Sequence, residues 1–208
     1  MAIKGKVGGS FEMTPAGVHK ARCVRIVDMG TQHNIKFDVL RRRVMFLFEL
    51  PETQMVDGKP FSISSFFTLS MNKKSNLRPF LESWRAKKFK DDEAANFDIS
   101  KLVGIPCTLN IVHDGDYANI QSIMPCKKSE CPKQINESFI FDLDDYSDER
   151  FGQLSEKMQE NIKITPEWAK LNSKKNRKGE EIEEIEEIEE DSFVSELEKE
   201  EEEEGAPF

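Results

Sequence analysis

Alternation of hydrophobic and polar positions dominates the first 125 residues and predicts an antiparallel β-sheet. The pattern is clearest over Phe61–Ser70, where Ile63 and Phe67 fall on one face and Phe66 falls on the other. Residues 30–43 show no such alternation, and we expect a long loop there. Four more strands are predicted from their apolar and β-branched content: Val18–Met29, Val44–Leu50, Ile105–His113 and Tyr117–Ile123.

The hydrophobic period changes to that of a helix after the third predicted strand. Leu77, Leu81 and Trp84 recur at helical spacing, and Pro79 falls in the first turn, where its missing N–H is tolerated. The resulting order is β-β-β-α-β-β, which is the order of an OB-fold, a small Greek-key barrel that binds oligonucleotides. We therefore expect a mainly β protein, a five-stranded OB-fold barrel with a helix between strands 3 and 4. A plain α+β sandwich is the alternative.

Composition divides the chain into three parts. Residues 1–128 contain these strands and form the expected OB-fold nucleic-acid-binding domain. Residues 129–173 are expected to be a small helical C-terminal extension that packs on the barrel, with a short strand at Phe139–Phe141. The helix is predicted from the spacing of four apolar residues, Phe151, Leu154, Met158 and Ile162. In residues 174–208 a Glu-Glu-Ile triplet repeats with a period that fits neither a helix nor a strand, so we expect a disordered acidic tail.

Charge is distributed very unevenly between the body and the tail. The whole chain carries 30 basic and 39 acidic residues, a formal net charge of −9. From Gly179 to Phe208 there are 16 acidic residues and one lysine, which leaves 29 basic and 23 acidic residues before Gly179. A body with a net charge of +6 indicates a polyanionic partner. The tail would then compete with that partner for the same surface.

Binding of single-stranded nucleic acid without sequence preference requires cations along the phosphate path and exposed rings on which bases stack. Phe66 and Tyr117 supply such rings on the polar faces of the third and fifth predicted strands. The cations that we assign to this role are Arg22, Arg25, Lys36, Arg41, Arg42, Arg43, Lys73, Lys74, Arg85, Lys87 and Lys88. The alternative for any single lysine is a solvated face, and the alternative for Phe66 is a core contact.

The residue patterns that support other chemistries are absent or incomplete. Cys126 and Cys131 form a C-x4-C pair, but a structural zinc site needs four ligands and the sequence holds no second pair. Glycine-rich phosphate loops and HExxH motifs do not occur. We therefore expect no metal, no cofactor and no catalytic residue, and thus no enzyme. The alternative is a metal-dependent nuclease or a replication initiator acting on DNA, although Tyr117 and Tyr146 lack the His-x-His motif that would activate an initiator tyrosine.

Hydropathy and cysteine content indicate a cytoplasmic protein. No apolar run is long enough to span a bilayer, and no secretory signal is recognisable. The four cysteines of so charged a chain do not resemble a disulfide framework, so reduced thiols are expected. The oligomeric state stays open between a monomer and a homodimer.

Two features of the sequence resemble phage single-stranded DNA-binding proteins. The first covers residues 16–124 and resembles a family of phage proteins encoded among replication genes. Its matching segments are Gly17–Cys23, Val27–Gln32, Thr68–Ser70, Leu81–Arg85, Phe97–Asp98, Leu102–Gly104 and Tyr117–Ile120. The second is the acidic terminus, because bacterial single-stranded DNA-binding proteins end in an acidic segment that closes on Pro-Phe, as Pro207 and Phe208 do here.

The resemblance implies a fold, a function and partners. The phage family is expected to have an OB-fold and to bind single-stranded DNA without sequence preference, protecting it during replication, recombination or repair. Pro207 and Phe208 would recruit replication or recombination proteins in the cytoplasm of the host cell. Glu204, Gly205 and Ala206 stand where the bacterial pattern has aspartates and isoleucine.

Overall fold

The computed structural model describes residues 12–35 and 38–173 of the chain. Described residues up to Ile162 form one compact unit, and those from Lys163 belong to a second. Within these described ranges, no helix is both long enough and apolar enough to cross a membrane. The predicted tail, residues 174–208, lies outside the described part, and so does Lys36.

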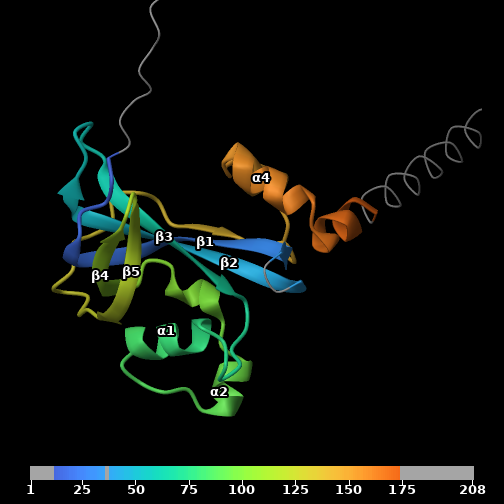
Figure 1. Ribbon diagram of the computed structural model, residues 1–208, viewed down its shortest axis with the longest axis horizontal. Helices are drawn as coiled ribbons and strands as arrows, with labels where there is room; N and C mark the ends of the chain where they lie inside the picture. The colour runs from blue at the N-terminus through green and yellow to red at the C-terminus, as the bar shows by residue number, and fades with distance from the viewer. Residues whose placement is uncertain (1–11, 36–37, 174–208) are drawn as a thin grey trace, which may run out of the picture. The chain divides into compact units, whose positions relative to one another are not determined.

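The compact unit is mainly β, as the hydrophobic pattern predicts, with short helices between and after the strands (Figure 1). Its strands are β1 (Gly17–Asn34), β2 (Val39–Gln54), β3 (Pro60–Thr68), β4 (Pro106–Asp114), β5 (Tyr117–Pro125) and β6 (Phe139–Phe141). Its helices are α1 (Leu77–Trp84), α2 (Asp91–Ala95), the 3-10 turn η1 (Ile99–Leu102), α3 (Asp148–Gly152) and α4 (Glu156–Lys163), whose last residue begins the second unit. Residues 166–173 of the second unit are helical.

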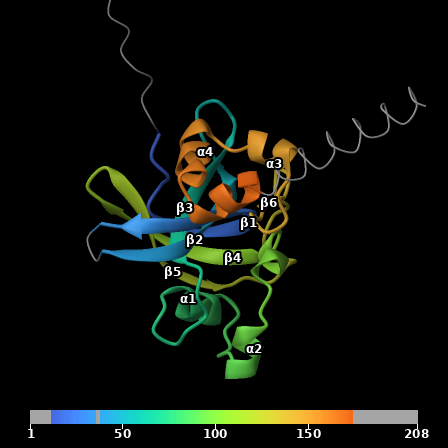
Figure 2. The same ribbon diagram turned by 90° about the vertical axis from the view of Figure 1, so that its right-hand side faces the viewer.

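All six of these strands belong to one sheet, in which the order is β3-β2-β1-β4-β5 and β6 is paired with β1. The pairs along this order are antiparallel, whereas β6 runs parallel to β1. No ladder joins the two end strands, β3 and β5, in the described residues, so the sheet is open. The closed five-stranded barrel that the sequence predicts is therefore not formed here. Figure 2 shows α1 and α2 on one side of the sheet and α3 on the other.

The prediction of a long loop over residues 30–43 is wrong, because β1 and β2 continue through this stretch as one hairpin. Gly30 pairs with Arg43, and the register continues to Asn34 opposite Val39. Beyond Gly30, none of the described side chains in the stretch is buried. Backbone hydrogen bonds therefore define these strands, and the side chains carry no hydrophobic alternation that would reveal them.

The hydrophobic core lies between the inner face of the sheet and helix α1. Phe46 and Phe48 of β2 are fully buried there. Phe46 meets Phe67 edge-on at a ring-centre distance of 5.8 Å, and Phe48 meets Trp84 at 5.5 Å. Trp84 also donates its indole N–H to the carbonyl of Pro106, at 2.9 Å, which fixes the end of α1 against the start of β4. Aromatic packing and one buried hydrogen bond thus hold the helix on the sheet.

Two predictions from the hydrophobic pattern are confirmed. Strand β3 alternates as expected, because Ile63 and Phe67 are buried whereas Phe66 is 46% exposed. The predicted helix is α1, and it buries Leu77 and Trp84. Phe66 is consequently left on the outer face of the sheet, opposite the core.

The segment after β5 covers the outer face of β1 and β2 at one end of the strands. Glu49 of β2 is fully buried beneath it. Its carboxylate accepts hydrogen bonds from the backbone N–H groups of Ile135, at 2.6 Å, and Asn136, at 2.8 Å. Arg22 lies opposite Glu49 in the register of β1 and β2 and is buried as well. The covering segment therefore closes Glu49 and Arg22 to solvent.

Strand β6 extends this cover along β1, which confirms the short strand predicted at Phe139–Phe141. Phe141 packs against Tyr146 and against Phe151 of α3, with ring centres 6.1 and 5.9 Å away. The compact unit thus includes the first part of the predicted extension. The domain boundaries that the sequence predicts at residues 128 and 173 stay predictions.

Candidate functional site

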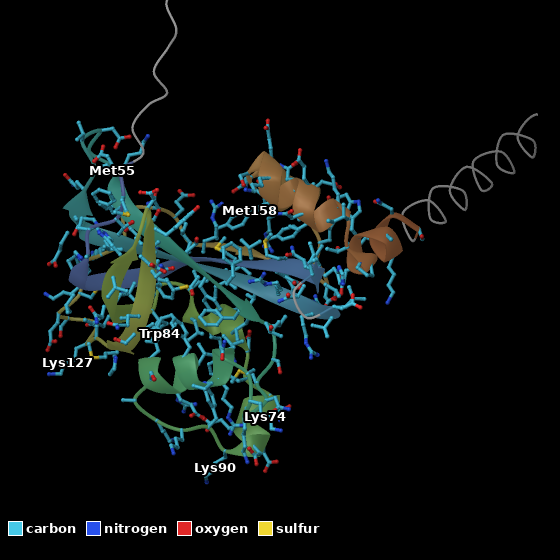
Figure 3. The ribbon with its side chains drawn as sticks, in the orientation of Figure 1. Met55, Lys74, Trp84, Lys90, Lys127 and Met158 are labelled. Atoms are coloured by element: carbon cyan, nitrogen blue, oxygen red, sulfur yellow. The ribbon has the colours of Figure 1, made fainter. Side chains whose placement is uncertain are left out.

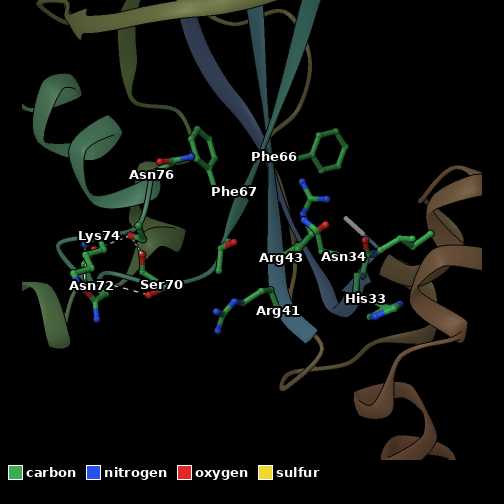
Figure 4. Close-up of a pocket in the computed structure, with 14 residues that line it drawn as sticks. His33, Asn34, Arg41, Arg43, Phe66, Phe67, Ser70, Asn72, Lys74 and Asn76 are labelled. Carbon is green, nitrogen blue, oxygen red and sulfur yellow. Dashed lines mark hydrogen bonds between the residues drawn. The ribbon is translucent and has the colours of Figure 1, made fainter. Parts of the chain in front are cut away.

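A groove of about 800 Å³ lies where the end of the β1–β2 hairpin meets β3 and the loop before α1 (Figure 4). Strand β1 contributes His33, strand β2 contributes Arg41 and Arg43, and strand β3 contributes Phe66. The loop contributes Lys74. The groove therefore combines three side chains that carry a permanent positive charge with one exposed aromatic ring.

The charge of the groove is positive. No Asp or Glu is among the described residues that line it, although the whole chain contains 39. Arg41, Arg43 and Lys74 form no ion pair within the described ranges of the chain. Their charges are thus not neutralised by the protein, and together they attract an anion.

Phe66 presents its ring beside one of these cations. The guanidinium carbon of Arg43 is 5.6 Å from the centre of the Phe66 ring, and Figure 4 shows the two side chains next to each other. This distance is within the range of a cation–π contact. Because Phe66 is 46% exposed, the ring still has free surface on which another planar group can stack.

Hydrogen bonds within the loop before α1 fix the backbone at Lys74. The side-chain oxygen of Asn72 accepts a hydrogen bond from the backbone N–H of Lys74 at 3.1 Å. The backbone carbonyl of Asn72 accepts one from the backbone N–H of Ser75 at 2.9 Å. The hydroxyl of Ser75 donates to the carbonyls of Ser70 and Asn72 (Figure 4). Such side-chain-to-backbone bonds define a turn locally. Lys74 therefore extends from a fixed backbone position, while its ammonium group stays exposed.

The three consecutive arginines of β2 divide between two environments, because successive residues of a strand point to opposite faces. Arg41 and Arg43 line the groove. Arg42 forms ion pairs with Asp28 and, at 2.9 Å, with Asp144. The hydrogen bonds that Arg42 donates to Asp28, together with the negative charges of Asp28 and Asp144, raise the pKa of Arg42. Although the sequence assigns all three arginines to phosphate binding, the surroundings of Arg42 instead tie β2 to the segment after β6.

Arg22 and Arg25 of β1 lie under the cover of the outer face rather than in the groove. Arg22 is 6% exposed and donates to the carbonyls of Gly104 and Cys131, each at 2.9 Å. The guanidinium carbon of Arg25 is 4.3 Å from the centre of the Phe139 ring of β6, and burial lowers the pKa of Arg25. Both arginines thus hold the segment after β5 against β1, and the buried Arg22 is closed to phosphate.

The other predicted cations that the structure describes lie outside the groove. Lys73 pairs with Asp91 at 2.8 Å, and Arg85 pairs with Glu93 at 2.6 Å. Two lysines of the turn after α1 are exposed, Lys87 and Lys88. Of the two predicted rings, Tyr117 on β5 is 75% exposed but does not line the groove. The structure therefore brings together four of the predicted residues, Arg41, Arg43, Phe66 and Lys74.

Sequence reasoning missed the polar residues that complete the groove. His33 is one of them, and its Nε2 lies 2.8 Å from a carboxylate oxygen of Asp38. Asn72 and Asn76 of the loop are others. The sequence signal for these residues is a run of small polar residues around two lysines, between a predicted strand and a predicted helix. Such a run is also typical of an ordinary connecting loop, so it does not by itself predict a binding site.

The cysteines contribute to packing. All four are free thiols. Cys107 and Cys131 both donate to the carbonyl of Ala21, at 3.6 and 3.4 Å, and burial raises the pKa of each of these two thiols. Over residues 12–35 and 38–173, no group of three or more His, Cys, Asp or Glu side chains is placed to hold a metal ion. The buried thiols thus join β1, β4 and the segment after β5.

Comparison of the chain with protein-family models, with curated proteins and with solved structures finds no match.

Proposed function

We propose that this protein binds single-stranded DNA without sequence preference and protects it during replication and recombination, without catalysing a reaction. The observation that carries this proposal is the groove. Arg41, Arg43 and Lys74 line it together with the exposed ring of Phe66, and no carboxylate is among its described lining residues. A phosphate backbone is bound by such cations, and a base stacks on such a ring.

The arrangement favours a single strand over a duplex. Phe66 can stack only on a base whose face is free, and bases in a duplex are stacked on one another. The cations come from two segments of the groove, since the arginines belong to β2 and Lys74 to the loop before α1. A single strand can therefore place its phosphates on the cations and turn a base towards Phe66.

The position of the groove on the fold supports the same function. OB-folds bind oligonucleotides on the face of strands 2 and 3 and through the loop between strands 1 and 2. The groove is lined by β2, by β3 and by the end of the β1–β2 hairpin. The order β3-β2-β1-β4-β5 would close into a barrel if β3 paired with β5. We accordingly propose that the sheet is a partly open OB-fold.

The resemblance of the sequence to phage single-stranded DNA-binding proteins agrees with this function and adds a second site. Pro207 and Phe208 lie outside the described residues, and we propose that they recruit replication or recombination proteins. A protein with this role would act in the cytoplasm of the host cell.

Titration of the full chain with fluorescent single-stranded and duplex oligonucleotides of one sequence tests the proposal. We expect tighter binding to the single strand, with a log–log salt slope of roughly −0.7 for each phosphate contact. The double variant Arg41→Gln with Arg43→Gln should make this slope less steep by the contribution of roughly two phosphate contacts. The matched control is Lys127→Gln with Lys128→Gln, which removes the same charge from residues that do not line the groove.

Several outcomes would contradict the proposal. A binding constant that does not depend on salt would exclude phosphate contacts, and equal affinity for the duplex would exclude stacking on a free base. Tighter binding to RNA of the same sequence would assign the groove to a different nucleic acid. Shortening of the oligonucleotide when magnesium is added would favour the alternative of a metal-dependent nuclease.

A further inference from the structure

A second hollow, of about 300 Å³, is lined by Lys73, the residue before Lys74 of the groove. Lys73 and Lys88 line it from two segments, the loop before α1 and the turn after α1. The groove is lined by Lys74, and the second hollow is lined by the adjacent residue Lys73. The two hollows therefore share one loop as a wall, and each receives one of its two consecutive lysines.

Arg78 of α1 holds the two sides of the second hollow together. It is buried, and its guanidinium donates to the carbonyl of Phe89 at 2.7 Å and to that of Met71 at 3.4 Å. These two carbonyls belong to the turn after α1 and to the loop before it. Arg78 also pairs with Glu82 and Asp91, each at 3.1 Å. The lysines on the two segments consequently keep a defined position relative to each other.

The carboxylates near this hollow are already engaged. Glu82 accepts from the backbone N–H of Phe89 at 3.0 Å and from Arg78, which keeps the pKa of its carboxyl group below the usual value. Asp91 accepts from Lys73 and Arg78, and these bonds lower its pKa in the same way. Three exposed lysines of the turn form no ion pair within the described chain: Lys87, Lys88 and Lys90. The second hollow thus has an excess of positive charge.

We infer that the DNA-binding site continues from the groove past Lys74 and Lys73 into the second hollow, where Lys88 binds a phosphate of the same strand and the adjacent exposed Lys87 binds another. This inference rests on the proposed function and adds the path that the strand takes. Lys73 can exchange Asp91 for a phosphate at little cost, because exposed ion pairs contribute little to stability. Figure 3 shows Lys74 and Lys90 on the same side of the molecule, whereas Lys127 lies well apart from both.

The test compares two oligothymidylates, one of about 4 and one of about 16 nucleotides, which span the site sizes of OB-folds. The short one is expected to occupy the groove, and the long one should reach the second hollow as well. Lys87→Gln with Lys88→Gln should weaken binding of the long oligonucleotide several-fold at low salt and reduce its salt slope by roughly 0.7 for each lost contact. Affinity for the short oligonucleotide should stay unchanged. Lys127→Gln with Lys128→Gln is the control for the loss of two charges.

Protection of lysines from acetylation, measured by mass spectrometry on the unaltered full chain, gives a second test that requires no variant. Lys88 should be protected by the long oligonucleotide and not by the short one. Lys128 should be protected by neither. Protection of Lys88 by the short oligonucleotide would overturn the proposed path.

The remaining outcomes separate this inference from the proposed function. If Arg41→Gln with Arg43→Gln weakens binding of the short oligonucleotide, but the variant at Lys87 and Lys88 behaves like the control, the groove binds DNA and the continuation is wrong. If neither oligonucleotide binds to the unaltered chain, the inference and the proposed function both fail.

Discussion

At the scale of single residues, neighbours of the same type have different roles because adjacent side chains of a strand leave it on opposite faces. Arg41 is exposed in the groove, whereas Arg42 lies between Asp28 and Asp144. Phe66 and Phe67 show the same contrast. Phe66 is exposed, whereas Phe67 is buried and its ring centre is 4.6 Å from that of Phe80. Arg42 and Phe67, whose side chains contact other parts of the fold, are therefore controls for the exposed residues beside them.

Replacing either phenylalanine of this pair should affect a different property. Phe66→Ala is expected to weaken binding of single-stranded DNA by about 1–3 kcal/mol, the contribution of one stacked base, and to change the free energy of unfolding little. Phe67→Ala should lower the free energy of unfolding by roughly 3–5 kcal/mol, because it removes a buried ring. Urea unfolding and fluorescence titration of both variants measure the two effects. A large loss of stability in Phe66→Ala would place that ring in the core instead.

At the scale of elements, the outer face of the sheet is divided between a cover and a groove. The segment after β5 lies over β1 and β2 at the end that contains Glu49. The groove occupies the hairpin end, which contains Arg43. Because the cover also encloses Arg22 and stacks on Arg25, these cations are withdrawn from solvent. Arg41 and Arg43 at the hairpin end are thus the arginines of β1 and β2 that line the groove.

Glu49→Ala is expected to loosen this cover. The change removes the acceptor of the N–H groups of Ile135 and Asn136, and a hydrogen bond to a charged group contributes roughly 1.5–3 kcal/mol. Hydrogen exchange followed by mass spectrometry should become faster over residues 131–141 and stay unchanged in the groove. Glu52→Ala removes an exposed carboxylate from the same strand and should have no such effect. Equal exchange over 131–141 in both variants would show that the cover does not depend on Glu49.

At the scale of the whole molecule, charge separates the body from the residues that follow it. The chain before Gly179 has a net charge of +6, and the remainder, which lies outside the described residues, has a net charge of −15. A charged segment attached to the same chain is present at high effective concentration near the groove. It should therefore compete with phosphate for the cations.

Deletion of residues 179–208 is expected to tighten binding of single-stranded DNA several-fold, most strongly at low salt, where screening is weakest. A full-length variant in which Gln replaces every Glu of residues 179–208 should also bind single-stranded DNA more tightly, because the competition depends on charge. Deletion of Pro207 and Phe208 alone leaves that charge in place and should change DNA affinity little. Titrations of the three variants over a range of salt concentrations measure the difference. Weaker binding after the full deletion would exclude this competition.

Much of the fold could be predicted because an element that buries one face has hydrophobic residues at regular intervals along its sequence. The alternation of β3 and the helical spacing of α1 each mark one face that packs into the core. The ends of β1 and β2 could not be predicted, because backbone pairing holds them and their side chains face solvent. The sequence likewise does not indicate whether the sheet is open or closed, since this depends on whether β3 and β5 come within hydrogen-bonding distance.

The sequence by itself determined the mainly β architecture, the face of β3 to which Phe66 belongs and the opposite charges of the two parts of the chain, because each follows from composition or local order. Only the tertiary structure decided which arginines remain free. Arg42 is bound by a carboxylate 102 positions away, and Arg22 by the carbonyl of Cys131, 109 positions away. The local sequence around an arginine does not indicate partners so distant. An arginine that is bound within the fold and one that is free to bind phosphate therefore cannot be distinguished from the sequence alone.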